Sequence, residues 1–146
     1  MKFTQLFALS TILVTAGYAQ KASIGVPLPG EAVQAGSNIT VEIDRPNSLT
    51  PSTEVGIGIG FLSCVDFNSS ACPSPSEVLG SILYSGPFNP QYTNVSSSKP
   101  PHQNFTVTIP STAKSGPAQI AVTHSSLVGA GPFPFNEVFN ITVNVA

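Results

Sequence analysis

Apolar and polar residues alternate in short stretches along most of this 146-residue chain, and one alternating pattern occurs three times. NITVEI begins at Asn38, NFTVTI at Asn104 and NITVNV at Asn140, all with the order Asn–apolar–Thr–Val–x–aliphatic. Successive side chains of a strand point to opposite faces, so each stretch has one apolar and one polar face. We predict three half-buried strands. Their unequal spacing argues against a tandem repeat.

The same reading predicts seven strands separated by turns rich in glycine and proline. They are Ser23–Val26, Asn38–Ile43, Glu54–Leu62, Val78–Tyr84, Asn104–Ile109, Ala118–Leu127 and Phe135–Val145. The 14 scattered prolines disfavour helices, because proline lacks the N–H that a helix interior needs. About seven short strands with turn signals between them are typical of an all-β, immunoglobulin-like antiparallel β-sandwich.

One predicted strand has three glycines on the same face, in the stretch GIGIG from Gly56 to Gly60. The stretch resembles a phosphate-binding glycine loop, but no helix is predicted after it, as such a loop requires. A strand with one bare face is the simpler interpretation. We expect an aromatic ring, a neighbouring backbone or a partner to pack against that face.

The first residues predict a secretory signal peptide. Lys2 supplies the positive charge, Leu6–Ala16 the apolar core, and Gly17 and Ala19 the small residues of a cleavage site. The apolar run is too short to cross a bilayer. We therefore predict a signal peptide at residues 1–19 and a single secreted, extracellular domain at 20–146, without a membrane anchor.

The two cysteines, Cys64 and Cys72, are predicted to form a disulfide, because secreted proteins fold in oxidising compartments. A metal site or a redox pair has less support, since no C-x-x-C motif and no nearby histidine accompany them. Closing this short loop should contribute at most about 2.6 kcal/mol to stability.

Five asparagines begin Asn-x-Ser/Thr acceptor sequences for N-glycans. They are Asn38, Asn68, Asn94, Asn104 and Asn140. In the three repeated strands the alternation places the asparagine on the polar face, where a bulky glycan can be attached. We predict that at least some of the five are glycosylated.

Charged residues are few and scattered, with a formal net charge of −2. The absence of a basic patch argues against a nucleic-acid partner. The two histidines are His102, in a proline-rich loop that enters a strand, and His124, whose facing the alternation leaves ambiguous. Asp44 or Asp66 could complete a Ser–His–Asp arrangement, but no G-x-S-x-G motif occurs.

Paired carboxylates for sugar hydrolysis could come from Glu42, Asp44 and Glu54. However, Glu42 and Asp44 share one face of a predicted strand, which we expect to be an ordinary solvent face. We therefore predict no catalytic residue, no metal site and no cofactor. A small hydrolase remains a rival that a glycosidase and esterase screen would expose.

A carbohydrate-binding module is a second rival, because sandwiches serve that role and aromatic residues occur in or near loops. They are Tyr84, Phe88, Tyr92, Phe133 and Phe135. The chain has no tryptophan, the residue that such binding platforms commonly use, and these rings are more simply read as plugs at the ends of the sandwich. Retention on chitin, glucan or cellulose would distinguish the two readings.

Two long stretches resemble fungal secreted proteins of the necrosis-inducing type, the Nis1 family. They are SIGVPLPGEAVQAGSNITVEI, near the start of the mature chain, and GPAQIAVTHSSLVGAGPFPFNEVFNITVNVA, at its end. The resemblance implies a secreted, non-enzymatic effector that suppresses plant pattern-triggered immunity by binding receptor-associated kinases and that can induce cell death. It also implies action outside host cells or after translocation into them.

No catalytic residues are carried over from the family. For partner contact we favour three loops: Val65–Ala71 between the cysteines, the long connection Gly86–Gln103, and the corner Gly129–Pro134. Loops on a rigid scaffold are where sandwiches usually bind. The disulfide loop and the long connection are departures from the family pattern.

Overall fold

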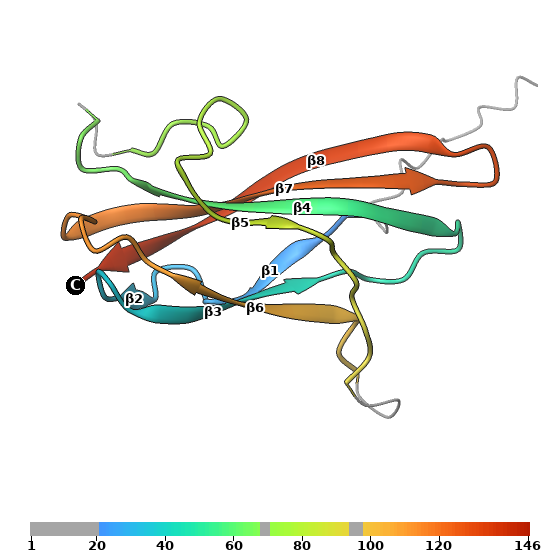
Figure 1. Cartoon of the computed structure of the whole chain (residues 1–146), viewed down its shortest axis with the longest axis horizontal. Helices are drawn as coiled ribbons and strands as arrows, with labels where there is room; N and C mark the ends of the chain where they lie inside the picture. Colours follow the sequence, from blue (N-terminus) through green and yellow to red (C-terminus); the bar gives the residue numbers. More distant parts are fainter. Residues whose placement is uncertain (1–20, 68–70, 94–97) are drawn as a thin grey trace, which may run out of the picture.

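The computed structural model of the chain describes residues 21–67, 71–93 and 98–146, which form an all-β sandwich (Figure 1). Its strands are β1 (Ser23–Val26), β2 (Ala32–Val33), β3 (Asn38–Asp44), β4 (Ser52–Ser63), β5 (Ser81–Gly86), β6 (His102–Thr108), β7 (Gly116–Val128) and β8 (Phe133–Val145). These ranges contain no helix. The predicted signal peptide, residues 1–19, lies outside the described residues.

The strands form two sheets, one with the order β1-β3-β6 and the other with the order β2-β8-β7-β4-β5. Long antiparallel pairings of β7 with β8 and with β4 form the centre of the larger sheet. The predicted all-β sandwich is therefore confirmed. Several strand bounds differ by a few residues, the described residues form eight strands instead of seven, and the unpredicted β2 pairs with β8 in parallel. With only two residues, β2 is too short to show an alternating pattern.

The three repeated stretches supply inward-facing residues to the core between the sheets. Val41 and Ile43 of β3, Val107 of β6, and Val143 and Val145 of β8 are all buried. Each such side chain contributes roughly 1.5–3 kcal/mol when it is fully removed from water. The shared phrase therefore encodes half-buried strands, as predicted.

The bare face of β4 is covered in part by the segment that leads into β5. Gly80 has a φ of 83°, which few other residues tolerate, and the turn there places Leu79 over Gly60. A Cβ at Gly60 would overlap the Leu79 carbonyl oxygen. The expected neighbouring backbone is therefore present, and the same turn explains why β5 begins at Ser81 instead of Val78. Gly56 and Gly58 line an open, shallow groove.

Candidate binding site at the loop end

Three chain segments lie at the same end of the sandwich, which we call the loop end. They are the β3–β4 connection (45–51), the first part of the β5–β6 connection (87–93) and the β7–β8 corner (129–132) (Figure 1). The Gly129 N–H donates a hydrogen bond to the Pro51 carbonyl at 2.9 Å and so ties the corner to the β3–β4 connection. Residues of 45–54 and 88–92, with Pro101, line a groove of about 630 Å³.

Large apolar side chains project into solvent at this end. Leu49 is fully exposed, and Tyr92 and Phe133 are exposed over about half or more of their surface. Asn47 Nδ2 donates a 2.7 Å hydrogen bond to the Tyr92 hydroxyl, which joins the two connections across the groove. Exposed aromatic and aliphatic side chains around a groove are typical of a protein-binding surface.

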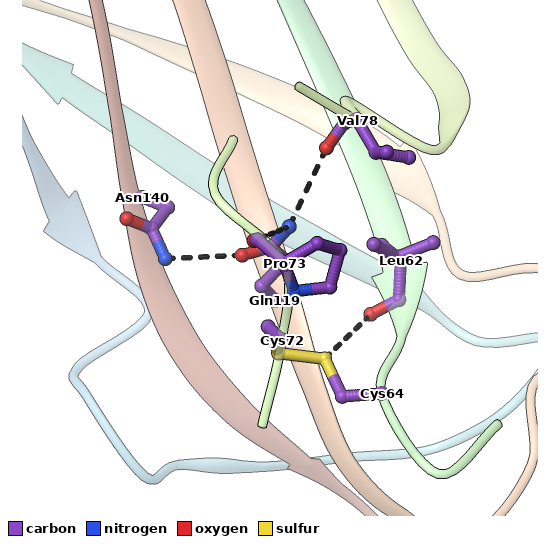
Figure 2. The surroundings of a disulfide bond; sticks show 7 residues. All are labelled: Leu62, Cys64, Cys72, Pro73, Val78, Gln119 and Asn140. Carbon is purple, nitrogen blue, oxygen red and sulfur yellow. Dashed lines mark hydrogen bonds between the residues drawn. A yellow bond between two sulfur atoms is a disulfide. The ribbon is translucent and has the colours of Figure 1, made fainter. Parts of the chain in front are cut away.

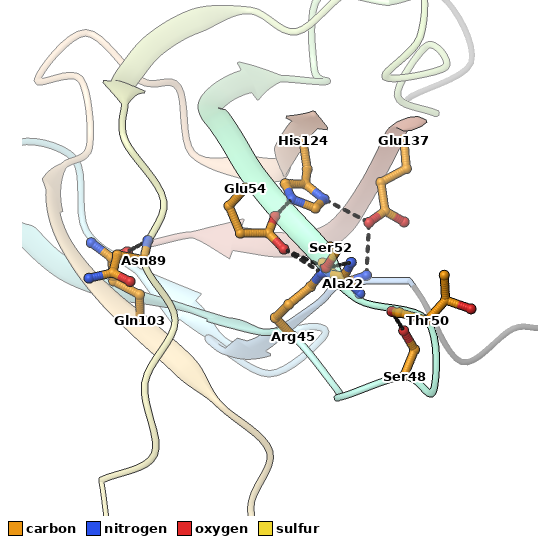
Figure 3. A network of polar contacts seen from close by, with 10 residues as sticks. All are labelled: Ala22, Arg45, Ser48, Thr50, Ser52, Glu54, Asn89, Gln103, His124 and Glu137. Carbon is orange, nitrogen blue, oxygen red and sulfur yellow. Dashed lines mark hydrogen bonds and ion pairs between the residues drawn. The ribbon is translucent and has the colours of Figure 1, made fainter. Parts of the chain in front are cut away.

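A buried ionic network lies beneath the groove, with His124 at its centre (Figure 3). His124 is completely buried. Its Nδ1 lies 2.9 Å from Glu137 Oε1, and its Nε2 is hydrogen-bonded to Glu54 Oε2. The Phe88 ring packs edge-on against the imidazole, with centroids 5.3 Å apart. The ambiguity left by the alternation is thus resolved: His124 faces the interior.

A β-bulge in β4 explains how Glu54 reaches the histidine. The pairing of β4 with β7 shifts register between Glu54 and Gly56. As a result, Glu54 is opposite Ser126 while the core residue Ile57 is opposite His124. Strict alternation would place Glu54 on the outer face with the glycines, so the bulge is what turns its carboxylate inward.

The network also includes the β3–β4 connection and the segment that precedes β1. Arg45 Nε lies 3.1 Å from Glu54 Oε1, and its guanidinium also donates to Ser52 Oγ at 3.2 Å. On the other side, the Ala22 N–H donates to Glu137 Oε1 at 2.9 Å. Segments from five parts of the sequence are therefore joined at the base of the loop end.

The network favours the protonated, charged form of His124. Burial opposes that charge and is the largest single influence, but the hydrogen bonds with Glu137 and Glu54 and their negative charges together raise the pKa of His124. Burial likewise opposes the charge on Glu54, yet His124 and Arg45 outweigh it and lower the pKa of that carboxyl. When His124 is protonated, its charge and that of Arg45 balance the two carboxylates of Glu54 and Glu137.

This arrangement is suited to holding the fold together and not to nucleophilic catalysis. In a Ser–His–Asp site one ring nitrogen faces a carboxylate and the other faces the attacking hydroxyl. Both nitrogens of His124 face carboxylates. No hydroxyl therefore has access to this imidazole as a base.

The other histidine belongs to a second polar cluster, on the outer face of the three-stranded sheet. His102 Nδ1 lies 2.9 Å from the Pro100 carbonyl, and Lys99 Nζ lies 2.6 Å from Glu42 Oε1. Burial, followed by repulsion from Glu42, raises the pKa of Asp44.

The expectation that Glu42 would be on an ordinary solvent face is wrong, because its exposure is only 5%. Glu42 and Asp44 do share the outer face, but the segment that carries Lys99 and Pro100 closes over it. Glu54 faces the interior, so the three carboxylates do not converge on one site. Among the described residues no three His, Cys, Asp or Glu side chains are grouped to hold a metal ion.

The disulfide lies at the opposite end of β4 from the groove, because Cys64 directly follows the last residue of β4, whereas Ser52, the first residue, lines the groove. Figure 2 shows the surroundings of the disulfide. Cys64 and Cys72 are bonded, with their Cα atoms 4.8 Å apart, as predicted. Nearby, the buried Gln119 donates to the Pro73 carbonyl at 3.3 Å and accepts from Asn140 Nδ2 at 3.2 Å. The bridge thus anchors the segment that follows β4 onto the outside of the larger sheet.

The three loops favoured for contact are therefore divided between the two ends. The described parts of Gly86–Gln103 and the corner Gly129–Pro134 belong to the loop end. The described part of Val65–Ala71 is at the disulfide end, where Lys114 forms an ion pair with Asp66. Asp66 therefore lies far from both histidines and completes no triad.

Three of the predicted glycan acceptors fall on described residues. Asn38, Asn104 and Asn140 are all exposed, as the alternation requires. Asn68 and Asn94 lie outside the described residues.

Of the aromatic residues considered for a platform, only Tyr92 and Phe133 are strongly exposed at the loop end. Phe88 is buried, and the partly buried Tyr84 packs at a tilt against Phe105 with ring centroids 4.6 Å apart. These two rings pack against the core, but the exposure of Tyr92 and Phe133 does not fit the reading in which the rings plug the ends of the sandwich.

Sequence reasoning missed three contributors to the loop end: Arg45, Leu49 and Glu137. A lone apolar residue in a turn, such as Leu49 in RPNSLTPS, was a usable signal, because nothing nearby could bury it. Arg45 and Glu137 gave no such signal. The partner of Arg45 is Glu54, and the partner of Glu137 is His124, which the pairing of β7 with β8 places opposite it.

Across the parts of the chain that the structure describes, no helix has the length and apolarity needed to span a bilayer. A comparison with curated proteins gives no match. The model of the Nis1 family matches residues 18–144, which is most of the chain. This effector-type family and the disulfide point to a secreted protein. The chain therefore belongs to the Nis1 family, as its two long stretches of resemblance suggested.

Proposed function

We propose that this protein is a secreted, non-enzymatic effector that acts by binding a protein partner through its loop end. Family membership directs the search for that partner toward plant receptor-associated kinases and the immune output that they control. The expected consequences are suppression of pattern-triggered immunity and, in some settings, cell death.

The observation that carries the proposal is the combination of exposed anchors and a rigid base at the loop end. Tyr92 lines a groove of about 630 Å³, and Leu49 and Phe133 present further exposed apolar surface on the β3–β4 connection and at the start of β8. Beneath them, the network centred on His124 joins the three long strands β4, β7 and β8 and ties the β3–β4 connection to them through Arg45. A preorganised surface binds better because less conformational entropy is lost on association.

The non-enzymatic part of the proposal is supported by how the ionisable groups of the site are used. Glu54 and Arg45, the charged groups that line the groove, are engaged with each other and with His124. A general base needs a free lone pair within reach of a substrate. The groove offers amides, hydroxyls and rings for recognition instead.

The test is the oxidative burst that follows a microbial elicitor in a plant leaf expressing the protein, with and without residues 1–19. The control is an unrelated secreted β-sandwich that accumulates to the same level. We expect a smaller burst with this protein and co-purification of a receptor-associated kinase. An unchanged burst, with the protein shown to accumulate, would contradict the effector function for this family member.

A carbohydrate-binding function is a second candidate, favoured by the chemistry of the groove lining. Asn47, Asn89, Gln91 and Tyr92 supply amides and a ring whose hydroxyl is fixed by Asn47. Such groups suit a neutral saccharide, and retention on chitin, glucan or cellulose columns tests it. Passage through all three without delay would remove this candidate.

A further inference from the structure

The three described glycan acceptors all lie on the outer faces of the sandwich. Asn38 and Asn104 are on the outer face of the three-stranded sheet, on the paired strands β3 and β6. Asn104 is opposite Glu42, four residues along β3 from Asn38, so the two acceptors are about 13 Å apart along the strand. Two glycans attached there would cover most of this small sheet.

The third acceptor is on the outer face of the five-stranded sheet. Asn140 is exposed on β8, opposite Ala121 of β7. Its side-chain nitrogen is held beside the buried Gln119, at the edge of the segment anchored by the disulfide (Figure 2). A glycan there would project over the face that includes Val138.

The loop end differs from the two outer faces, because it has exposed apolar side chains and no glycan acceptor among its described residues. Leu49, Tyr92 and Phe133 are exposed there, and no described residue of 45–54, 86–93 or 128–134 begins an acceptor sequence. Large exposed apolar side chains and bulky polar glycans have opposite effects on association, since the former favour contact and the latter prevent it. Among the described residues, the acceptors and the three exposed loop-end side chains thus lie on separate surfaces; the acceptor Asn94, two residues after Tyr92, is outside the described residues.

We propose that N-glycans on Asn38, Asn104 and Asn140 cover the two outer faces and leave the loop end as the bare surface that binds the protein partner. The second half of this inference rests on the proposed function. In the attachment step, the asparagine side-chain nitrogen forms a bond to C1 of an oligosaccharide. The bond from C1 to a lipid-diphosphate donor breaks, the lipid diphosphate leaves, and one amide proton is released.

The first test measures glycan occupancy, and it does not depend on any partner. The protein is secreted from a glycosylating host, and peptides with Asn38, Asn104 and Asn140 are analysed by mass spectrometry before and after enzymatic glycan release. We expect all three asparagines to be occupied. Thr142→Ala should abolish the glycan on Asn140 while keeping the hydrogen bond to Gln119. Unmodified asparagine at all three positions would overturn the glycan half of the inference.

The second test places a new glycan on each surface in turn. Leu49→Thr completes an acceptor at the exposed Asn47, on the loop end, and Val138→Thr completes one at Asn136, on the outer face of the larger sheet. The double variant Asn47→Gln/Leu49→Thr has the same change at position 49 but no acceptor. All versions also carry Ser70→Ala and Ser96→Ala, so that glycans on Asn68 and Asn94 make no contribution.

Suppression of the oxidative burst is then compared at equal protein level, with occupancy confirmed for each variant. The loop-end glycan of Leu49→Thr should weaken suppression at least tenfold relative to the unglycosylated double variant, whereas Val138→Thr should match the parent. Loss with Val138→Thr and retention with Leu49→Thr would overturn the surface assignment. If the parent itself fails to suppress the burst, the proposed function fails, while occupancy still decides the glycan half.

Discussion

At the residue scale, the central feature is a fully buried histidine held between two carboxylates. Glu54 and Glu137 favour the charged form of His124 against the cost of burying it, and Arg45 supplies a second positive charge beside Glu54. Removing one partner from a buried ion pair leaves an uncompensated charge, which costs far more than the pair contributes to stability. The network should therefore be sensitive to single substitutions and to pH.

Stability should decline on the alkaline side because of His124. A group whose pKa is raised on folding contributes stability that is complete below its unfolded pKa, about 6.5, and is lost as the pH rises through the raised folded value. Urea unfolding between pH 6 and pH 10 should show this decline. A His124→Gln variant serves as the control and should have a flatter profile over the same range. Parallel profiles for the two proteins would contradict the assignment.

The lowered pKa of Glu54 has the opposite sign. Its contribution is present above the usual carboxyl value of 4.5 and is lost as the pH falls through the lowered folded pKa. Acid unfolding of Glu54→Gln should therefore be less steep below pH 4.5 than that of the parent. Equal steepness would show that Glu54 is not held ionised by His124 and Arg45.

Replacement of His124 by leucine should be among the most damaging single changes in the chain. It leaves Glu54 and Glu137 facing an apolar side chain, and we expect a loss of about 3–5 kcal/mol in the free energy of unfolding. Chemical denaturation measures this loss. The control is Thr123→Val, at the neighbouring outward-facing position, for which a change within about 0.5 kcal/mol is expected.

At the element scale, the close approach of Leu79 to β4 makes a specific glycine indispensable. A Cβ at Gly60 would overlap the Leu79 backbone, whereas a Cβ at Gly131 would meet open space. Gly60→Ala should therefore cost about 1–3 kcal/mol, as overpacking does, and Gly131→Ala should be nearly neutral. Thermal unfolding of the two variants checks this. Equal midpoints would contradict the packing described for β4 and β5.

The disulfide should stabilise its own end of the sandwich without affecting the groove. Cys64→Ala/Cys72→Ala removes the loop closure and should lower the free energy of unfolding by at most about 2.6 kcal/mol. Because the bridge follows the end of β4 and the groove lies at its beginning, partner binding should be unchanged at temperatures where the variant is folded. Weaker binding by a folded variant would place contact residues near the disulfide.

Strand periodicity and family resemblance made most of the fold predictable. The inward positions of the repeated phrase, such as Val41 and Val143, follow directly from alternation. The ionic network was not predictable in this way, because alternation places Glu54 on the outer face of β4. The bulge after Glu54 turns its side chain to the inner face instead. The burial of Glu42 was missed for another reason: it depends on a distant connection that folds back over the strand.

At the scale of the whole molecule, the two ends of the sandwich differ in structure. The disulfide end holds a short loop by covalent and hydrogen bonds, with a local ion pair at its surface. The loop end combines a buried ionic base, a groove and the exposed side chains of Leu49, Tyr92 and Phe133. This polarity supports a binding protein whose contact surface is the loop end.

The most direct measurement is the oxidative burst in leaves that express the parent, Leu49→Ala/Phe133→Ala or Leu28→Ala at equal levels, since alanine at position 49 creates no glycan acceptor at Asn47. Leu28 is a matched control, because its exposure of 65% is close to the 67% of Phe133 and it lies near β2, away from the groove. The parent and Leu28→Ala should keep full activity in suppressing the burst, and the double variant should be at least tenfold less potent. Equal suppression by all three proteins would contradict a binding role for the loop end.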